Sequence, residues 1–192
     1  MLTTRQLTAN NWADVEQVLG ASGGDKGCWC QWWCREPREY DAMTAAERRK
    51  ALQGHVNSGD IVGVIGYVDS TPVGWCAVAP GTRTLPRRAR SRAWKSPDDT
   101  EVWSITCFFI VADQRGLGRA SELLAGAEAF ARSNGAQCLE AYPRDCMGGQ
   151  LADKAMFFGS LGMFLDAGFT EVARKLPEFP VVRKELRRLP IY

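Results

Sequence analysis

The sequence predicts an α+β fold, in which a sheet is flanked by helices without a regular alternation of strand and helix. Three observations indicate it. The chain has 192 residues, of which 45% are hydrophobic and 24% charged, so it can form a substantial core. No segment repeats at a period of about 20 to 50 residues. The expected elements run strand, two helices, three strands, helix, strand, helix, two strands. We therefore expect one domain over residues 1–192.

The first part of the chain predicts two helices and three strands. A strand is expected over 3–7, and Asn10 and Asn11 are candidate N-caps for an amphipathic helix over 12–19. Thr44 stands three residues before Glu47, the spacing of a capping box, and predicts a helix to about residue 55. Two segments rich in β-branched residues, 61–68 and 73–79, are separated by Asp-Ser-Thr-Pro and predict a hairpin.

The second part predicts four more strands and two helices. The segment 101–110 is the most strand-like in the chain and runs into a glycine-containing turn. Apolar residues then recur at helical spacing until Asn134 and Gly135, which favour a helix end. The remaining elements are expected as a strand at 137–142, a helix at 154–166, and strands at 169–175 and 181–186.

Charge and cysteine content exclude several classes of protein. Lysine and arginine number 24 and the acidic residues 22, so a net charge of +2 gives no reason to expect a nucleic-acid or membrane partner. We expect a cytoplasmic protein, because the first residues do not resemble a signal peptide and no apolar run approaches a membrane span. The seven cysteines are expected to be reduced. Cys28, Cys30 and Cys34 lack the usual C-x2-C spacing and the single histidine is distant, so no metal is expected.

The segment 81–97 has the strongest charge asymmetry, because it contains six cations and no acid. They are Arg83, Arg87, Arg88, Arg90, Arg92 and Lys95. Such a run is either a solvated surface connection or a contact for a phosphate or an acidic substrate, and the sequence leaves both interpretations open.

The residues 115–120, Arg-Gly-Leu-Gly-Arg-Ala, open the helix that follows the strand at 101–110. The first turn of a helix has backbone N–H groups without intrahelical partners, and with the helix dipole these attract phosphate. Gly116 and Gly118 remove side chains that would obstruct a pyrophosphate, while Arg115 and Arg119 add positive charge. The segment therefore predicts an anion site.

Two other phosphate-binding motifs fit less well. The lysine-containing P-loop does not occur in the sequence. A dinucleotide fingerprint would place glycine where Ser121 stands, with Glu140 as the acidic residue about 20 positions later. The turn between strand and first glycine is also longer than that motif allows. Dinucleotide binding remains a less favoured alternative.

The segment 115–120 resembles the acyl-CoA pyrophosphate motif R-x-x-G-x-[G/A] of the GCN5-related N-acetyltransferases, the GNAT superfamily. Leu123-Leu124 and Ala167-Gly168-Phe169 also match the family pattern. The resemblance implies a mixed, mostly antiparallel sheet of about six to seven strands with about four helices, and acetyl-CoA as co-substrate. It implies that the cofactor is bound by Phe108, Phe109, Ile110, Arg115, Gly116, Leu117, Gly118, Arg119, Ala120 and Ser121.

The resemblance also implies a mechanism, in which a primary amine attacks the thioester in a ternary complex. Backbone N–H groups near Phe109 and Ile110 would polarise the thioester carbonyl. We expect Glu101 as the general base, with Glu140 as second candidate.

Two positions depart from the family pattern. Phe164 replaces the usual tyrosine acid, so Tyr142, or otherwise Cys146, is expected to donate the proton; Phe157 replaces a cofactor-contacting asparagine.

The acceptor is expected to be a small-molecule or peptide amine, and the protein a monomer or homodimer. Trp29, Trp32 and Trp33 lie where the resemblance implies a wall of the acceptor pocket, although tryptophans are equally common as core anchors. Because Phe164 and Phe157 replace polar family residues, a non-catalytic CoA-binding module is the alternative to an enzyme.

Overall fold

The computed structural model describes residues 1–20, 23–147 and 157–186, and its centre is one seven-stranded sheet. The strands are β1 (Thr3–Gln6), β2 (Val64–Val68), β3 (Thr71–Pro80), β4 (Trp103–Ile110), β5 (Cys138–Ala141), β6 (Thr170–Arg174) and β7 (Pro180–Glu185). Their order across the sheet is β1-β2-β3-β4-β5-β7-β6. Only the β4–β5 pair is parallel, and the other five are antiparallel. The mixed, mostly antiparallel sheet is thus confirmed.

The helices of the described residues are more numerous than the four or so expected. The α-helices are α1 (Trp12–Leu19), α2 (Pro37–Ala42), α3 (Ala45–Asn57), α4 (Leu85–Arg88), α5 (Arg119–Ser133) and α6 (Leu161–Asp166). Short 3-10 turns are η1 (Ala9–Asn11), η2 (Asp25–Gly27), η3 (Gly81–Thr84) and η4 (Ala112–Gln114). The sequence missed α2 and α4 because helices of one or two turns are too short to show an amphipathic period. Part of the helix expected at 154–166 lies outside the described residues.

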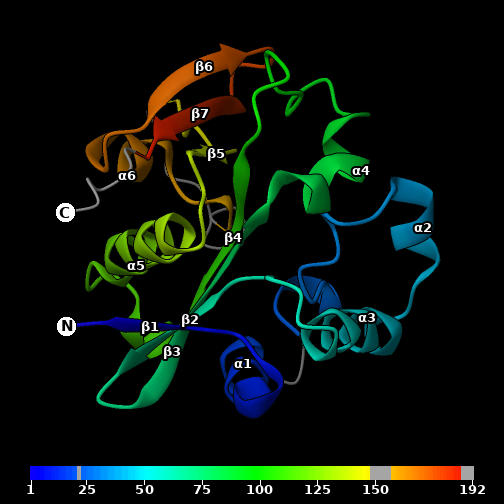
Figure 1. Cartoon of the computed structure of the whole chain (residues 1–192), viewed down its shortest axis with the longest axis vertical. Helices are drawn as coiled ribbons and strands as arrows, with labels where there is room; N and C mark the ends of the chain where they lie inside the picture. The colour runs from blue at the N-terminus through cyan, green and yellow to red at the C-terminus, as the bar shows by residue number, and fades with distance from the viewer. Residues whose placement is uncertain (21–22, 148–156, 187–192) are drawn as a thin grey trace.

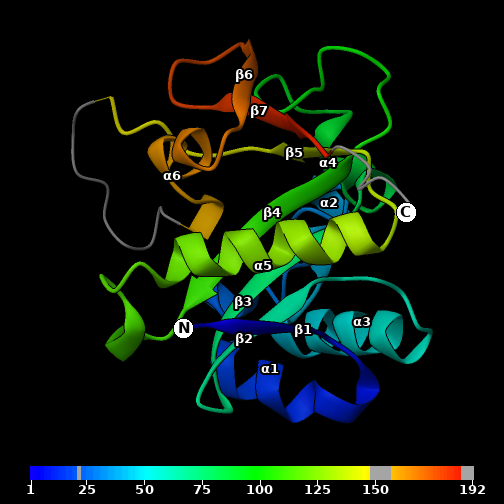
Figure 2. The same ribbon diagram turned by 60° about the vertical axis from the view of Figure 1, so that its left-hand side comes forward.

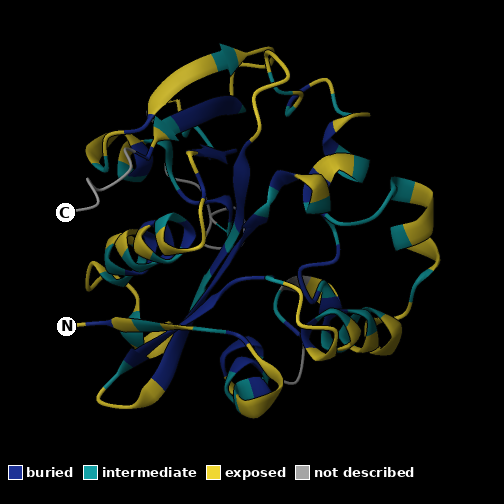
Figure 3. Ribbon diagram, viewed as in Figure 1, coloured by how far each residue is buried: buried dark blue, intermediate teal, exposed yellow. Residues whose placement is uncertain are grey.

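Helices cover both faces of the sheet (Figure 1). On one face, α5 and α6 bury Leu123, Leu124 and Phe164 against β3 and β4. On the other face, α1 and α3 pack Val15 and Leu52 against β2 and β3. The central strands are accordingly buried, whereas the outer sides of the helices are exposed (Figure 3). No helix of the described residues is both long and apolar enough to cross a membrane.

Local sequence explains the boundaries that position the site. The capping box is present, because Thr44 Oγ1 accepts from the Glu47 N–H and Glu47 bonds back to the Thr44 N–H. The β2–β3 hairpin turns at Asp69 and Ser70, both with positive φ, which is the tight turn that suits the strand twist. Gly126 lets α5 approach β1, since a Cβ there would lie 2.3 Å from Thr4 Cγ2.

Candidate active site

The two central strands separate beside the predicted cofactor segment. β4 and β5 pair over three positions only, from Trp103–Leu139 to Ile105–Ala141. After Ala141 the segment that follows β5 no longer pairs with β4, and Arg144 forms an isolated bridge with Ser160. Figure 2 shows the two strands together at one end and apart at the other. Among the described strands, residues 106–110 of β4 have a partner only on the β3 side, and no described strand covers their other edge. We call this place the fork.

A β-bulge at the fork divides the side chains of β4 between the two faces. Cys107 pairs with Ala77 and Ile105 with Val78, so Thr106 is the extra residue. Phe108 lies in the α5–α6 core, where its ring centroid is 5.8 Å from that of Phe164. Ser104 and Thr106 instead line a cavity on the α3 side. The bulge breaks strict alternation, so this division is not visible in the sequence.

The glycine loop lies directly after β4, as predicted. Gly116 and Gly118 have φ of 73° and 74°, in the left-handed region that favours glycine. A Cβ at either position would meet nothing within 4 Å, so their conformation, and not local crowding, requires glycine. Gly118 caps α5 without a side-chain hydrogen bond, and within the described chain the N–H groups of residues 116–120 make no backbone hydrogen bond. These donors and the helix dipole suit a pyrophosphate.

The two arginines of the loop differ in their surroundings. Arg115 is exposed, and its Nε donates to the Ile110 carbonyl at 2.9 Å, which ties the loop to the end of β4. Arg119 is ion-paired with Glu122 at 2.7 Å, and this bond lowers the pKa of Glu122. Arg119 is thus partly neutralised, whereas Arg115 is the more exposed of the two arginines.

The remaining predicted cofactor residues lie at or beside this loop, and the side chain of one of them is buried in the core. Leu117 is 59% exposed, and the Ser121 N–H closes the first turn of α5 onto the Gly118 carbonyl. Ala120 and Phe109 are half-buried. Phe108 is the exception: its side chain is buried in the core, so only its backbone remains for a cofactor.

The two predicted catalytic residues are not brought together. Glu101 is exposed and precedes β4 at the closed end of the fork. Five residues at about 3.3 Å each place it roughly 16 Å from Thr106, beyond the reach of a base acting through one water. Tyr142 follows β5 at the fork itself and is 1% exposed. The position of Glu101 therefore does not suit the expected base.

Tyr142 belongs to a buried polar network. Its hydroxyl donates to Glu140 Oε1 at 2.7 Å and lies 3.2 Å from Ser104 Oγ. Burial, and then the neighbouring charge of Glu140, raise the pKa of Tyr142 well above its usual range. A phenol with so high a pKa is a weak proton donor to a thiolate, so its surroundings do not favour the expected role.

Glu140, the second candidate base, is the centre of that network, a structural role that the sequence did not indicate. The carboxylate is 0% exposed and forms ion pairs with Arg88 at 2.9 Å and with Arg183 at 2.8 Å. Ser96 Oγ donates to it at 2.7 Å. Accepting a proton would weaken two buried ion pairs, which makes Glu140 a poor base. It fastens the segment 81–97 to β5 and β7.

The two phenylalanines that replace polar family residues pack against other aromatic rings. Phe164 is fully buried, and its ring packs on Phe108 and Phe169. Phe157 packs on Phe158, with ring centroids 4.2 Å apart. Cys146, the second candidate proton donor, is half-buried in the segment after β5.

The tryptophan-rich loop divides between core and fork. Trp29 stacks on Trp12 in the α1–α3 core and is a packing anchor. Trp33 is 2% exposed and stacks on Tyr142 at 4.9 Å, with Trp32 against it. Within the described chain, no three histidine, cysteine or acidic side chains meet as a metal site. Burial raises the pKa of the Cys28 thiol to about 11, and burial also raises the pKa of the Cys34 thiol above its usual range.

A small cavity lies on the α3 side of the fork. It has room for about one water molecule, about 10 Å³. Its described lining contains neither a carboxylate nor a histidine. The lining residues are Cys30, Cys34, Leu52, Val62, Ala77, Ala79, Arg83, Thr84, Ser104 and Thr106. The polar side-chain groups that line the cavity on this side of the fork are therefore hydroxyls, thiols and one guanidinium.

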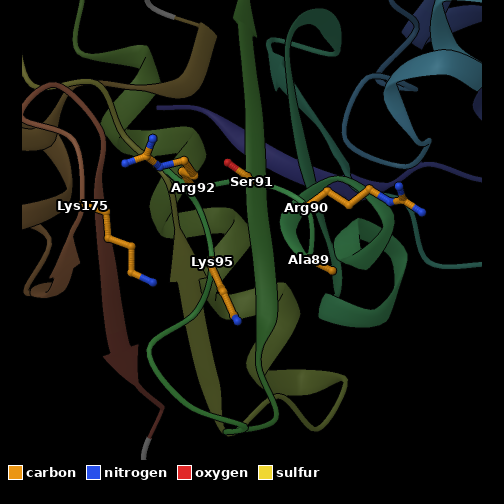
Figure 4. A pocket seen from close by; sticks show the side chains of 6 residues that line it. All are labelled: Ala89, Arg90, Ser91, Arg92, Lys95 and Lys175. Atoms are coloured by element: carbon orange, nitrogen blue, oxygen red, sulfur yellow. The ribbon is translucent and has the colours of Figure 1, made fainter.

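The basic segment 81–97 serves several purposes. Arg87 donates to the Trp32 carbonyl and lies over its ring, and Arg90 pairs with Glu36 at 2.9 Å. Arg92 and Lys95 line an open depression of about 550 Å³ with Lys175, and the side chain of Arg90 extends away from them (Figure 4). Of the six cations of this segment, only Arg83 lines the cavity at the fork.

The comparisons with known proteins agree with this geometry. Residues 26–156 match the Acetyltransferase (GNAT) family model. No curated protein is similar enough in sequence to count as a relative.

Many solved structures are similar. A GNAT-family acetyltransferase of Streptococcus agalactiae is 12% identical, covers 97% of this chain and 96% of its own, and has a TM-score of 0.58. The PaiA N-acetyltransferase of Thermoplasma acidophilum, solved with coenzyme A, is 12% identical over 97% and 99% of the chains, with a TM-score of 0.56. A ribosomal-protein-alanine N-acetyltransferase of Brucella melitensis is 15% identical over 95% and 99%, with a TM-score of 0.55.

At these identities the structural likeness shows the fold alone, whereas the family model covers more than half of the sequence. The forked strands, the glycine loop at the start of α5 and this match lead to one conclusion: the chain belongs to the GNAT family of acetyltransferases.

Proposed function

We propose that this protein transfers the acetyl group of acetyl-CoA to a primary amine of a small molecule or peptide, by direct attack in a ternary complex. The observation that carries the proposal is the position of the glycine loop, which presents unpaired N–H groups immediately beyond the open edge of β4. Support for an amine acceptor comes from the neighbours of Thermoplasma acidophilum and Brucella melitensis, which are N-acetyltransferases.

The cofactor has two sets of contacts in this proposal. Its pyrophosphate lies at the N–H groups of residues 116–120 with Arg115 beside it. Its pantetheine arm lies in the fork and uses the open backbone edge of residues 106–110. Acetyl-CoA supplies an activated acyl group when bound there.

The acceptor amine approaches from the α3 side of the fork. Its nitrogen forms a bond to the thioester carbon, and backbone N–H groups of β4 stabilise the negative charge on the oxygen. The C–S bond then breaks and CoA leaves as a thiolate. A thiol titrates near pH 8.5 in water, so the thiolate leaves without a protein acid, consistent with Phe164 in the tyrosine position. The proton of the attacking amine goes to water, because the described cavity lining has no base.

A thermal-shift series with acetyl-CoA, CoA and NAD tests the cofactor assignment. A ligand at about 100 times its dissociation constant adds roughly 2.7 kcal/mol of stability if it binds only the folded state. We expect stabilisation by acetyl-CoA and CoA, and its loss in Arg115→Glu. Arg92→Glu, at the opposite end of β4, is the charge-matched control and should keep it.

An amine screen with mass-spectrometric detection of acetylated product then tests transfer. Stabilisation by NAD alone would contradict the proposal in favour of a dinucleotide-binding protein. Stabilisation by acetyl-CoA without transfer to any amine would instead identify a non-catalytic CoA-binding module. The oligomeric state and the cytoplasmic location stay predictions.

A further inference from the structure

Arg83 is the one cation of the segment 81–97 that faces the acceptor side of the fork. It lies in η3, is half-buried and lines the cavity with Ser104 and Thr106. Burial raises the pKa of the neighbouring Cys34 thiol, and the positive charge of Arg83 acts in the opposite direction, which places the guanidinium close to it.

The three arginines that follow Arg83 in the segment are paired, and Arg83 is not. Arg88 is bound to Glu140, Arg90 to Glu36, and Arg87 to the carbonyl and ring of Trp32. Among the described residues, no side chain or carbonyl forms an ion pair or hydrogen bond with the Arg83 guanidinium. A half-buried charge without a partner is unfavourable, and a guanidinium matches a carboxylate with two parallel hydrogen bonds. The described part of the chain supplies no such partner, so a ligand that carries a carboxylate can take that place.

The size of the cavity limits what enters it. The sheet positions that line it carry small side chains, Ala77 and Ala79 on β3 with Ser104 and Thr106 on β4. The remaining room suits one water-sized group, and an amino group has that size. The hydroxyls of Thr84, Ser104 and Thr106 offer hydrogen-bond acceptors to it. Arg83 lines the cavity and is only half-buried, so part of the residue is exposed to solvent.

We propose that the acceptor is an amine that also carries a carboxylate, with the carboxylate paired to Arg83 at the mouth of the cavity and the amino group beside Thr106. The inference rests on the proposed function, since it names the class of acceptor for that reaction. The basic depression around Arg92 and Lys95 lies outside this cavity and takes no part.

Calorimetry on the full chain saturated with CoA tests the inference without requiring catalysis. The probes are a panel of amino acids and their amides, in which only the carboxylate is exchanged. We expect at least one amino acid to bind about tenfold or more tightly than its amide, as a charged hydrogen bond predicts. The amide has the less basic amino group, so more of it is in the neutral form at neutral pH. Tighter binding of the amino acid therefore cannot be explained by a larger supply of neutral amine. If no pair shows the preference, the inference is wrong.

Two variants locate the preference. Arg83→Gln should remove it while the affinity for the amide stays within about twofold, and Arg92→Gln, an exposed cation of the same segment, should preserve it. An equal loss for acid and amide in Arg83→Gln, or the same loss in Arg92→Gln, would overturn the assignment. Both variants should keep the melting temperature of the parent, because neither side chain has a described partner to lose.

Product analysis with acetyl-CoA separates this inference from the function it rests on. Carboxylate-dependent binding without acetylated product would contradict the transfer reaction and leave the Arg83 site standing. Equal acetylation of amines with and without a carboxylate would support the transfer reaction and contradict the Arg83 site.

Discussion

The cofactor side and the acceptor side of the fork are built in different ways. The cofactor side comes from one continuous stretch, in which β4, the glycine loop and the start of α5 follow directly upon one another. Its donors are backbone N–H groups. The acceptor side is assembled from side chains of separate segments, including the loop at 30–34, α3, β3 and η3. Backbone recognition of a phosphate is therefore encoded locally, whereas recognition of the acceptor depends on how distant segments meet.

Charged residues show the same contrast. On the cofactor side, Arg115 stays exposed next to unpaired N–H groups. On the acceptor side, Arg88 and Arg183 form ion pairs with the buried carboxylate of Glu140, so their charges stabilise the fold and are not available to a ligand. Positive charge in a sequence thus has no single meaning, because burial and partners decide whether it binds a ligand or holds the structure.

The largest loss of stability is expected where charged side chains are paired in the interior. Glu140→Ala leaves two arginines without their buried partner and should destabilise the protein by about 3–5 kcal/mol. For a chain of this length the melting temperature should fall by roughly 10 °C, measured by calorimetry. Glu101→Ala is the control, because its side chain is exposed and should change stability by no more than about 0.5 kcal/mol. Equal melting temperatures for the two variants would remove the contrast between them.

The second prediction separates backbone strain from ligand binding. Gly118 and Gly135 both have positive φ, and a Cβ at either would meet nothing within 4 Å. Alanine at each position should therefore cost about 1 kcal/mol in stability. Only Gly118→Ala should also weaken the binding of acetyl-CoA, by about tenfold, because Gly118 lies among the N–H groups that we propose bind the pyrophosphate. If both variants bind acetyl-CoA as the parent does, the loop is not the pyrophosphate site.

The third prediction concerns pH. No carboxylate or histidine lines the described cavity, and the raised pKa of Tyr142 keeps its phenol protonated at neutral pH. Below the pKa of the acceptor amine, kcat/KM should rise about tenfold per pH unit as the neutral amine becomes available. The midpoint of this pH profile of kcat/KM should move when an acceptor amine of different pKa is used. A midpoint that is the same for every amine would indicate a protein base instead.

The smallest effect is expected for Tyr142→Phe. It removes one hydrogen bond to Glu140 and should cost about 1–2 kcal/mol in stability. Because the phenol is a weak acid in this position, kcat should stay within about threefold of the parent, measured at saturating acetyl-CoA. A fall of a hundredfold or more would restore Tyr142 as the proton donor.

Regular periodicity made most elements predictable. Helix α1 has the expected bounds, the Thr44 capping box starts α3, and strand β4 differs by two residues at its start. The hairpin is tighter than expected, since Asp69 and Ser70 alone form the turn. Glu101 lies away from the fork for a tertiary reason: the fork opens at the other end of its strand, and only the pairing with β5 determines which end that is.

The sequence by itself determined the elements of the sheet and the glycine loop, because periodic burial and positive φ depend on residues close together in the chain. The tertiary structure decided which charges are buried together, where Thr106 bulges, and which cation faces the cavity. Glu140 lies 52 residues from Arg88 and 43 from Arg183, and nothing near it in sequence indicates either partner. Their attraction acts through space, so it is defined only once the strands have paired.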